Sequence, residues 1–152
     1  MDYLETAIDL CRAAGDILNY YADRDKLVEF KGHANLVTIA DKKSEELIIG
    51  GILSRYPSHS ILAEESGATQ SGAAVKWIID PLDGTTNFAH GYPFYCVSIA
   101  VEEKGEIVCG AVYDPVREEM FRKVTSLQSD VTHADATHSV GDVPHTDVAL
   151  GR

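Results

Sequence analysis

The residues with the clearest capacity for chemistry lie in one short stretch, residues 77–88. The stretch continues an apolar run at 75–79, of the kind that forms a buried strand. Two aspartates, Asp80 and Asp83, follow this run, and residues 84–87 then form a turn that could open a helix. A strand that ends in carboxylates and continues into backbone amides is suited to binding a divalent cation and a phosphate.

A second acidic segment occurs upstream of this stretch. Residues 60–63 form a short apolar strand that ends in two glutamates, of which Glu64 is the first. If this strand neighbours the one at 75–79, Glu64 converges with Asp80 and Asp83 at the rim of one sheet. Clustered carboxylates repel one another unless a hard cation such as Mg2+ neutralises them. The sequence therefore predicts a magnesium site at this rim.

The residues of such a site would have distinct roles. Two Mg2+ ions about 4 Å apart can activate a water and stabilise the leaving oxygen of a phosphoryl transfer. Asp80 is then the natural bridging ligand, and Asp83 and Glu64 flank it. The backbone carbonyl of Leu82 is a further candidate ligand.

The glycine and threonine that follow suggest where a phosphate would bind. Backbone amides at a helix start attract phosphate, and Gly84 would let the phosphate come close. The Thr85 hydroxyl could orient a metal-bound water, with a carboxylate such as Asp41 as its partner. Taken alone, Asp-Pro-Leu-Asp-Gly is more often a plain turn, and the two glutamates at 64–65 a solvated strand end. The combination of these features is much more specific than any one of them.

These residues must be positioned by helices and strands, and the sequence pattern predicts an α+β fold with two helices. Apolar side chains at helical spacing predict one helix over residues 2–22 and another from about 41 to 55. Residues 31–35 are expected to form a mobile loop between them. Residues 66–74 are expected to form a second loop.

The remaining elements are predicted to be strands. Residues 95–101 and 107–113 both alternate in polarity and favour an antiparallel hairpin around the turn at 103–106. Residues 119–124 are expected to add one more strand. These elements place residues 1–124 in one domain.

Composition narrows the class of protein. A chain of 152 residues with 45% hydrophobic residues can bury one ordinary core. The net charge of −11 argues against nucleic acid or an anionic membrane as a partner. The three cysteines have no metal-ligand spacing, and two lie in alternating apolar runs, so we expect reduced core thiols. Without a leader or a membrane-length apolar run, the expectation is a soluble, cytoplasmic protein.

Residues 125–152 differ from the rest of the chain, because their apolar density falls and no regular period survives. A loose repeat pairs Asp130, Asp135 and Asp142 each with a histidine three residues later. One interpretation is a metal-binding tail. The preferred interpretation is a disordered tail, since this composition buries too little surface to offset the entropy of ordering.

At this point the motifs resemble those of a known family. Residues 79–88, Ile-Asp-Pro-Leu-Asp-Gly-Thr-Thr-Asn-Phe, are similar to the first signature of the inositol monophosphatase family. Residues 62–66 resemble its Glu-Glu element, and residues 36–41 its upstream aspartate segment. The similarity extends to about Arg122. It implies the N-terminal half of a layered αβαβα fold, with two helices packed on a mainly antiparallel sheet.

The resemblance also implies an activity, the Mg2+-dependent, lithium-sensitive hydrolysis of a phosphate monoester, most simply inositol monophosphate. Two or three Mg2+ ions would be held by Glu64, Asp80, the Leu82 carbonyl and Asp83. Glu64 and Thr85 would activate the water, with Asp41 hydrogen-bonded to Thr85. Phosphate and substrate would bind Asp83, Gly84 and Thr85. The two secondary positions would be Glu65, as a weaker or outer metal position, and Lys31, on the mobile loop.

The pattern departs from the family after Val124. Family members continue with a second α/β half and a Trp-Asp signature that completes the metal site, whereas the one tryptophan here is Trp77. We therefore expect an N-terminal half followed by an unrelated tail, with one metal lacking a carboxylate ligand. Family members are commonly homodimers, so a homodimer is expected unless the second half carries that interface.

Three hypotheses follow from the sequence. The first is a phosphatase of the inositol monophosphatase type, in which water attacks phosphorus directly. The second is a catalytically impaired remnant or interaction module that retains the half-site. The third keeps the chemistry but changes the substrate to a nucleotide or sugar bisphosphate.

Overall fold

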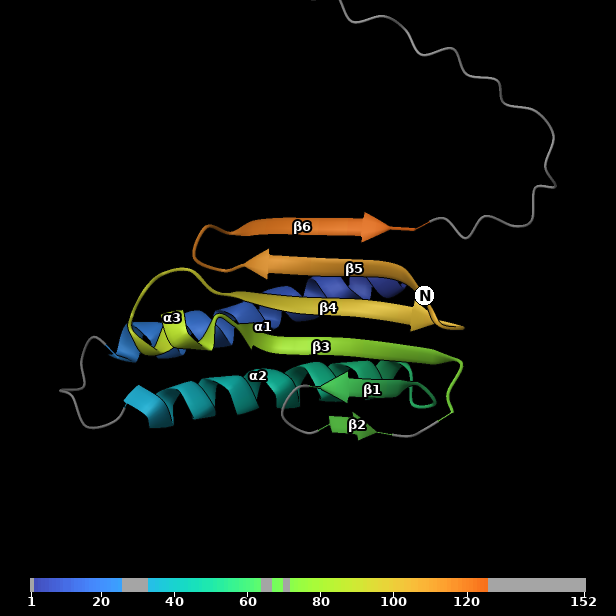
Figure 1. The fold of residues 1–152 in the computed structure, drawn as a ribbon, viewed down its shortest axis with the longest axis horizontal. Helices are drawn as coiled ribbons and strands as arrows, with labels where there is room; N and C mark the ends of the chain where they lie inside the picture. The colour runs from blue at the N-terminus through green and yellow to red at the C-terminus, as the bar shows by residue number, and fades with distance from the viewer. Residues whose placement is uncertain (1, 26–32, 64–66, 70–71, 126–152) are drawn as a thin grey trace, which may run out of the picture.

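The structure is a computed structural model that describes residues 2–25, 33–63, 67–69 and 72–125. Six strands form one sheet in the order β2-β1-β3-β4-β5-β6, and α1 and α2 lie side by side against one face of it (Figure 1). The elements are α1 (Tyr3–Asp25), α2 (His33–Arg55), β1 (Ser60–Ala63), β2 (Gly67–Thr69), β3 (Val75–Asp83), α3 (Thr85–Ala89), β4 (Cys96–Glu103), β5 (Glu106–Asp114) and β6 (Glu119–Val124).

The strand pairing confirms the expected mainly antiparallel sheet. β1 pairs with β3 in parallel, from Ser60 opposite Lys76 to Ala63 opposite Ile79, and every other neighbouring pair is antiparallel. The predicted hairpin is formed by β4 and β5, and the predicted last strand is β6. Because β1 and β3 are parallel neighbours, their carboxyl ends lie at the same edge of the sheet.

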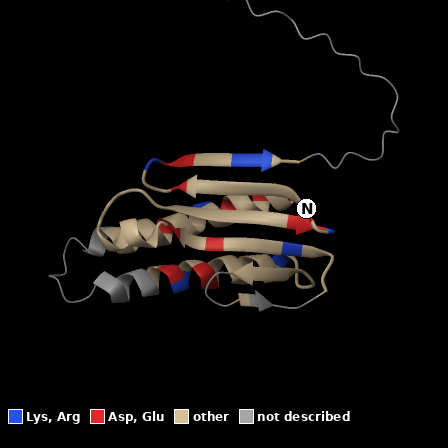
Figure 2. Ribbon diagram, viewed as in Figure 1, with Lys and Arg blue, Asp and Glu red and all other residues tan. Residues whose placement is uncertain are grey.

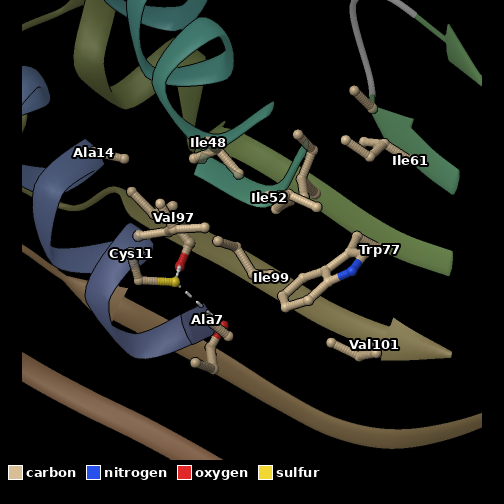
Figure 3. Close-up of a cluster of buried hydrophobic side chains, with 14 of the residues drawn as sticks. Ala7, Cys11, Ala14, Ile48, Ile52, Ile61, Trp77, Val97, Ile99 and Val101 are labelled. Carbon is tan, nitrogen blue, oxygen red and sulfur yellow. Dashed lines mark hydrogen bonds between the residues drawn. The ribbon is translucent and has the colours of Figure 1, made fainter. Parts of the chain in front are cut away.

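The core lies between the sheet and the two long helices, and Figure 3 shows its centre. Alternate residues of β3 and β4 point towards the helices, and Trp77, Val97 and Ile99 are at most 1% exposed. Each fully buried apolar side chain of this size stabilises the fold by about 1.5–3 kcal/mol. Burial also raises the pKa of Cys11 to about 12. This thiol is therefore a buried, free and protonated core group.

Two expectations about loops are corrected. Helix α2 begins at His33, about eight residues before the predicted start at 41, so the predicted loop at 31–35 is wrong from His33 onward. No glycine or proline interrupts residues 33–40, and each added residue of a formed helix gains a hydrogen bond. Within the predicted loop at 66–74, residues 67–69 pair with β1 as β2.

The end of β3 also differs from the prediction. The strand does not stop at Ile79 but continues through Asp83, with a shift of register between Asp80 and Asp83. The predicted helix after it is α3. The predicted tail at 125–152 lies outside the described residues except for Thr125. No helix in the described part of the chain is long and apolar enough to span a membrane.

An aromatic cluster closes the core beside the N-terminal end of β3. The ring of His59 stacks on Tyr56 at 4.8 Å between centroids, and the edge of Tyr3 contacts both rings. The indole N–H of Trp77 donates to Nδ1 of His59 at 3.0 Å. This bond requires Nδ1 to be unprotonated. Burial lowers the pKa of His59 from its ordinary value of 6.5, although the charge of Glu103 acts in the opposite direction.

The cluster predicts that acid weakens the fold through His59. A folded-state pKa below the unfolded value means that the stabilisation is complete above pH 6.5 and is lost as the pH falls through the folded value. Urea unfolding, followed by the fluorescence of Trp77, should therefore show a loss of stability below about pH 6.5. The variant His59→Gln should reduce this dependence, whereas His90→Gln, at an exposed histidine, should leave it unchanged. Equal pH profiles for wild type and His59→Gln would contradict the assignment.

Gly84 sets the entry into α3. Its φ of 93° and ψ of 33° lie in the left-handed region, which side chains other than glycine rarely adopt. A Cβ atom at this position would lie 3.0 Å from the Phe94 carbonyl oxygen and 3.3 Å from the Tyr95 Cα. Glycine is therefore required at position 84 for two reasons. It adopts the left-handed backbone conformation, and it leaves room for the segment before β4, which lies close to it.

We expect Gly84→Ala to lower the free energy of unfolding by more than the roughly 1–2 kcal/mol that a left-handed conformation costs alone. The matched control is Gly91→Ala, because Gly91 also has a positive φ of 66° but no atom within 4 Å of the added Cβ. Urea unfolding of both variants measures the difference. If Gly91→Ala is as damaging as Gly84→Ala, the contact with Phe94 is not the cause.

Candidate functional site

The two aspartates of β3 lie on the same face of the sheet because of an irregularity in the strand. Asp80 pairs with Ser98 and Asp83 pairs with Cys96, so three steps along β3 match two steps along β4. Side chains alternate along a regular strand, and residues three apart would point to opposite faces. The extra residue in β3 brings the side chain of Asp83 back to the face of the sheet that carries Asp80. Both carboxylates thus lie on the same face of the sheet as Ser98 and Cys96. Val97 lies on the opposite face, which packs against the helices.

The local sequence explains how the strand accommodates this extra residue. Pro81 has no backbone N–H, so it leaves no donor without a partner in the irregular segment. The next donor, the Leu82 N–H, binds Oδ1 of Asp80 at 3.2 Å. Pro81 is fully buried and Leu82 is 2% exposed. Asp80 therefore has a structural role as well as its predicted metal-binding role.

Cys96 is a site residue that sequence analysis assigned to the core. Its thiol is partly buried and donates to Oδ2 of Asp83 at 3.8 Å. Burial, followed by the negative charges of Asp83 and Asp80, raises its pKa to about 11. The influence of both charges on one thiol supports the conclusion that the two carboxylates share a face. No sequence signal could have revealed this, because the pairing register of β4 is a property of the folded sheet.

The start of α3 lies directly after Asp83. The first amides of any helix have no acceptor within the helix, and Gly84 provides no capping side chain. Thr85 and Thr86 are exposed there. The structure therefore places the Thr85 hydroxyl and the first amides of α3 directly after Asp83, and the phosphate site there stays a prediction.

Asp41 lies on α2, which packs against both β3 and α3. Its Oδ1 atom is shielded from solvent. The same helix carries two more buried polar groups that sequence analysis did not identify, Ser44 and Glu45, at 0% and 8% exposure. The Ser44 hydroxyl and Oε2 of Glu45 have no hydrogen-bond partner among the residues that the structure describes. A polar group in such a setting costs stability, so this stretch of α2 is unusually polar for a core helix.

Three predicted site residues, Lys31, Glu64 and Glu65, lie outside the described residues. Among the residues that are described, no group of three or more His, Cys, Asp or Glu side chains is placed to hold a metal. The described donor set therefore consists of Asp80 and Asp83. Mg2+ is typically held by one or two carboxylates together with waters and phosphate oxygens, so this donor set fits that ion.

A pocket of about 410 Å3 adjoins the two residues that follow Leu82, namely Asp83 and Gly84. On its far side lie the ends of β5 and β6 and the loop that connects α3 to β4. The Asn87 amide donates to the Phe94 carbonyl at 2.9 Å and so ties this loop to α3. The pocket is thus continuous with the predicted metal and phosphate positions.

Comparison with known proteins identifies relatives of this arrangement. The sequence pattern of the inositol monophosphatase family matches residues 1–149. An inositol monophosphatase from Dictyostelium discoideum is 46% identical over 123 residues, which cover 78% of this chain and 45% of the relative. A Nus factor SuhB from Pasteurella multocida is 47% identical over 124 residues, which cover 80% of this chain and 46% of the relative.

Solved structures give the same result for the fold. The inositol monophosphatase from Anabaena superposes with a TM-score of 0.70 at 41% identity, over 82% of this chain and 44% of that one. The chain thus spans about half the length of the relatives that it matches. The individual alignments cover about four fifths of the chain, whereas the family pattern continues to residue 149. Because this pattern spans nearly the whole sequence and the fold agrees with it, the chain belongs to the inositol monophosphatase family.

Proposed function

We propose that this chain provides the metal- and phosphate-binding half of a phosphatase that hydrolyses a phosphate monoester, most simply inositol monophosphate. The observation that carries the proposal is the shared face of Asp80 and Asp83, immediately before the exposed start of α3. The names of the relatives support the reaction class. Two carboxylates beside the amides of a helix start suit a cation and an anion that bind together.

The residues of the chain have distinct roles in this proposal. Bound Mg2+ would lower the pKa of a coordinated water and offset the charge of the phosphate. Asp80, Asp83, the Leu82 carbonyl and Glu64 would hold two or three such ions. The amides of Gly84 and Thr85 would donate to the phosphate oxygens and fix the orientation of the ester. Glu65 and Lys31 would act from the periphery of the site.

Hydrolysis then requires one attack and two proton transfers. Thr85, oriented by Asp41, and Glu64 would activate the attacking water, and Glu64 would accept its proton. The water oxygen forms a bond to phosphorus, and the bond from phosphorus to the ester oxygen breaks. Its electron pair remains on that oxygen, which takes up a proton from a second water and leaves as the alcohol. Inorganic phosphate is the other product, and no covalent phosphoenzyme forms.

Further properties belong to the same proposal. They are inhibition by Li+, a cytoplasmic location and assembly as a homodimer. A substrate with a second phosphate, such as a nucleotide or sugar bisphosphate, is the alternative within this reaction class.

A second candidate function is the alternative to turnover. The described half-site could bind Mg2+ and phosphate without hydrolysis, as a catalytically impaired remnant or interaction module. Measuring binding and hydrolysis separately distinguishes the two candidates.

The first test replaces one carboxylate. Asp83→Asn should lower the Mg2+-dependent release of phosphate from inositol 1-phosphate by about 100-fold or more, because a neutral amide is a poor ligand for Mg2+. Glu106→Gln is the control, since Glu106 is exposed at the opposite end of the β4–β5 hairpin. Equal rates for wild type and Asp83→Asn would exclude catalysis by this chain. Calorimetric titration with Mg2+ would then show whether a binding site alone remains.

The second test concerns the Thr85 hydroxyl. Thr85→Ala should lower the turnover number by roughly 100-fold, whereas Thr85→Ser, which retains the hydroxyl, should preserve most of it. Thr86→Ala is the matched control, because Thr86 is the next residue of α3 and is equally classed as exposed. The role given to Thr85 is wrong if Thr86→Ala and Thr85→Ala have the same turnover number.

A further inference from the structure

Strand β6 forms one edge of the sheet, and no strand lies on its outer side among the residues that the structure describes (Figure 1). Five of its six residues are exposed, and Phe121 and Val124 are each 61% exposed. An edge strand of this kind presents unpaired backbone N–H and C=O groups, which can pair with a further strand. β6 is therefore a position at which another chain can extend the sheet.

The backbone groups of β6 that face outward follow from its pairing with β5. The Thr125 N–H donates to the Val108 carbonyl at 2.9 Å, and the register then continues along β6 without a shift. In an antiparallel pair, every second residue exchanges hydrogen bonds with the residue opposite it. The outward-facing backbone groups of the strand are therefore those of the alternate residues Met120, Arg122 and Val124.

The side chains of β6 show an ordered arrangement of charge on one face. The register across β5, β4 and β3 places Phe121 on the same face of the sheet as Asp80. Glu119 and Lys123 lie two residues to either side of Phe121 and share its face. Neither forms an ion pair with another described residue. Figure 2 shows that β6 is acidic where it begins and basic towards its end.

A strand with this order of charges complements an antiparallel copy of itself. Charged side chains on an edge strand usually discourage pairing, because a partner strand brings like charges together. Two copies of β6 related by a two-fold axis instead bring the acidic beginning of each against the basic end of the other. The charge pattern of β6 therefore favours a second copy of this chain as the partner.

The outward-facing residues also restrict the register of such a pair. They must lie opposite one another, so the two-fold axis passes through a residue and not between two residues. An axis at Arg122 would place the two guanidinium groups opposite each other and Phe121 opposite Lys123. An axis at Phe121 places Met120 opposite Arg122 and Glu119 opposite Lys123. Of these two central registers, the second brings opposite charges together.

The turn before β6 is held by several hydrogen bonds, which lowers the cost of ordering the edge when it pairs. The Asn19 amide of α1 donates to the Pro115 carbonyl at 2.9 Å, and the Tyr95 hydroxyl donates to the Asn19 side chain at 3.0 Å. The Arg117 guanidinium binds Oδ2 of Asp114 at 2.7 Å. The strand is therefore anchored where it begins.

We propose that two copies of this chain associate through β6, as antiparallel edge strands centred on Phe121. Met120 of each copy exchanges backbone hydrogen bonds with Arg122 of the other, and Glu119 lies opposite Lys123. The two Phe121 rings contact each other across the axis. This interface gives the proposed homodimer a specific surface. It does not rest on the proposed hydrolysis, because it uses no residue of the metal or phosphate positions.

The first test reverses the charges. Sedimentation equilibrium of the 152-residue chain over a range of concentrations measures the dissociation constant of the dimer. Glu119→Lys and Lys123→Glu should each raise this constant by roughly 5- to 30-fold, because two symmetry-related pairs of opposite charge become pairs of like charge. The double variant should restore it.

General repulsion between the copies predicts a different result. Glu119→Lys reduces the net charge of −11 and Lys123→Glu increases it, so general repulsion would change the dissociation constant in opposite directions. Glu106→Lys is the matched control, because it makes the same change of charge at an exposed residue of β5. It should leave the constant within about twofold of wild type. Circular dichroism checks that all variants fold.

The second test concerns the register. The Cα atoms of a directly opposed pair that exchanges no hydrogen bonds lie about 4.5 Å apart, within the range of a disulfide. Phe121→Cys should therefore give a disulfide-linked dimer on oxidation, with a link between the two copies of residue 121 that mass spectrometry identifies. Val124→Cys should not, although Val124 is equally exposed, because the two copies of residue 124 would lie roughly 20 Å apart along the paired strands.

Three results would each overturn the proposal. They are a chain that is monomeric at every concentration, a dimer that Glu119→Lys leaves unchanged, and a Val124→Cys variant that cross-links as readily as Phe121→Cys. None of these measurements includes a hydrolysis step. The proposed phosphatase activity can therefore fail while the interface stands, and the interface can fail while the activity stands.

Discussion

The single extra residue between Asp80 and Asp83 places both carboxylates on the same side of the sheet. The first part of β3 turns Trp77 and Ile79 towards the helices and builds the core. In an unbroken strand, Asp83 would follow them onto that apolar face, where an unpaired carboxylate is costly. The irregular segment avoids this outcome and brings the second carboxylate to the side of the first. One strand thus serves the core along its beginning and the site at its end.

Much of the fold could be predicted from the sequence, because alternation and helical spacing are local properties. The β4–β5 hairpin followed from such patterns, whereas the neighbouring positions of β1 and β3 entered the sequence analysis only as a condition for the site. The start of α2 at His33 could not, since residues 33–40 show no clear helical spacing and are helical through their attachment to a packed helix. The three residues of β2 form a strand only because they pair with β1.

The candidate site, like the fold, could be predicted from the sequence only in part. The types of its residues, above all Asp80, Asp83 and Gly84, were evident from their order along the chain. The two carboxylates lie on one face of the sheet, with Cys96 beside them, because of the register between β3 and β4. Register is fixed by the whole sheet and leaves no trace in a short motif. The pocket beside Asp83 likewise combines residues from α3, β4, β5 and β6 that no spacing rule connects.

Asn19 gives helix α1 an influence on a cavity that it does not line. One side-chain amide holds the hydroxyl of Tyr95, under the pocket, and the carbonyl of Pro115, in the turn before β6. These two bonds link the segment before β4 to the turn between β5 and β6 through one residue of α1. The placement of Tyr95, which lines the cavity, therefore depends on a helix that does not line it. A substitution at Asn19 would remove both contacts at once.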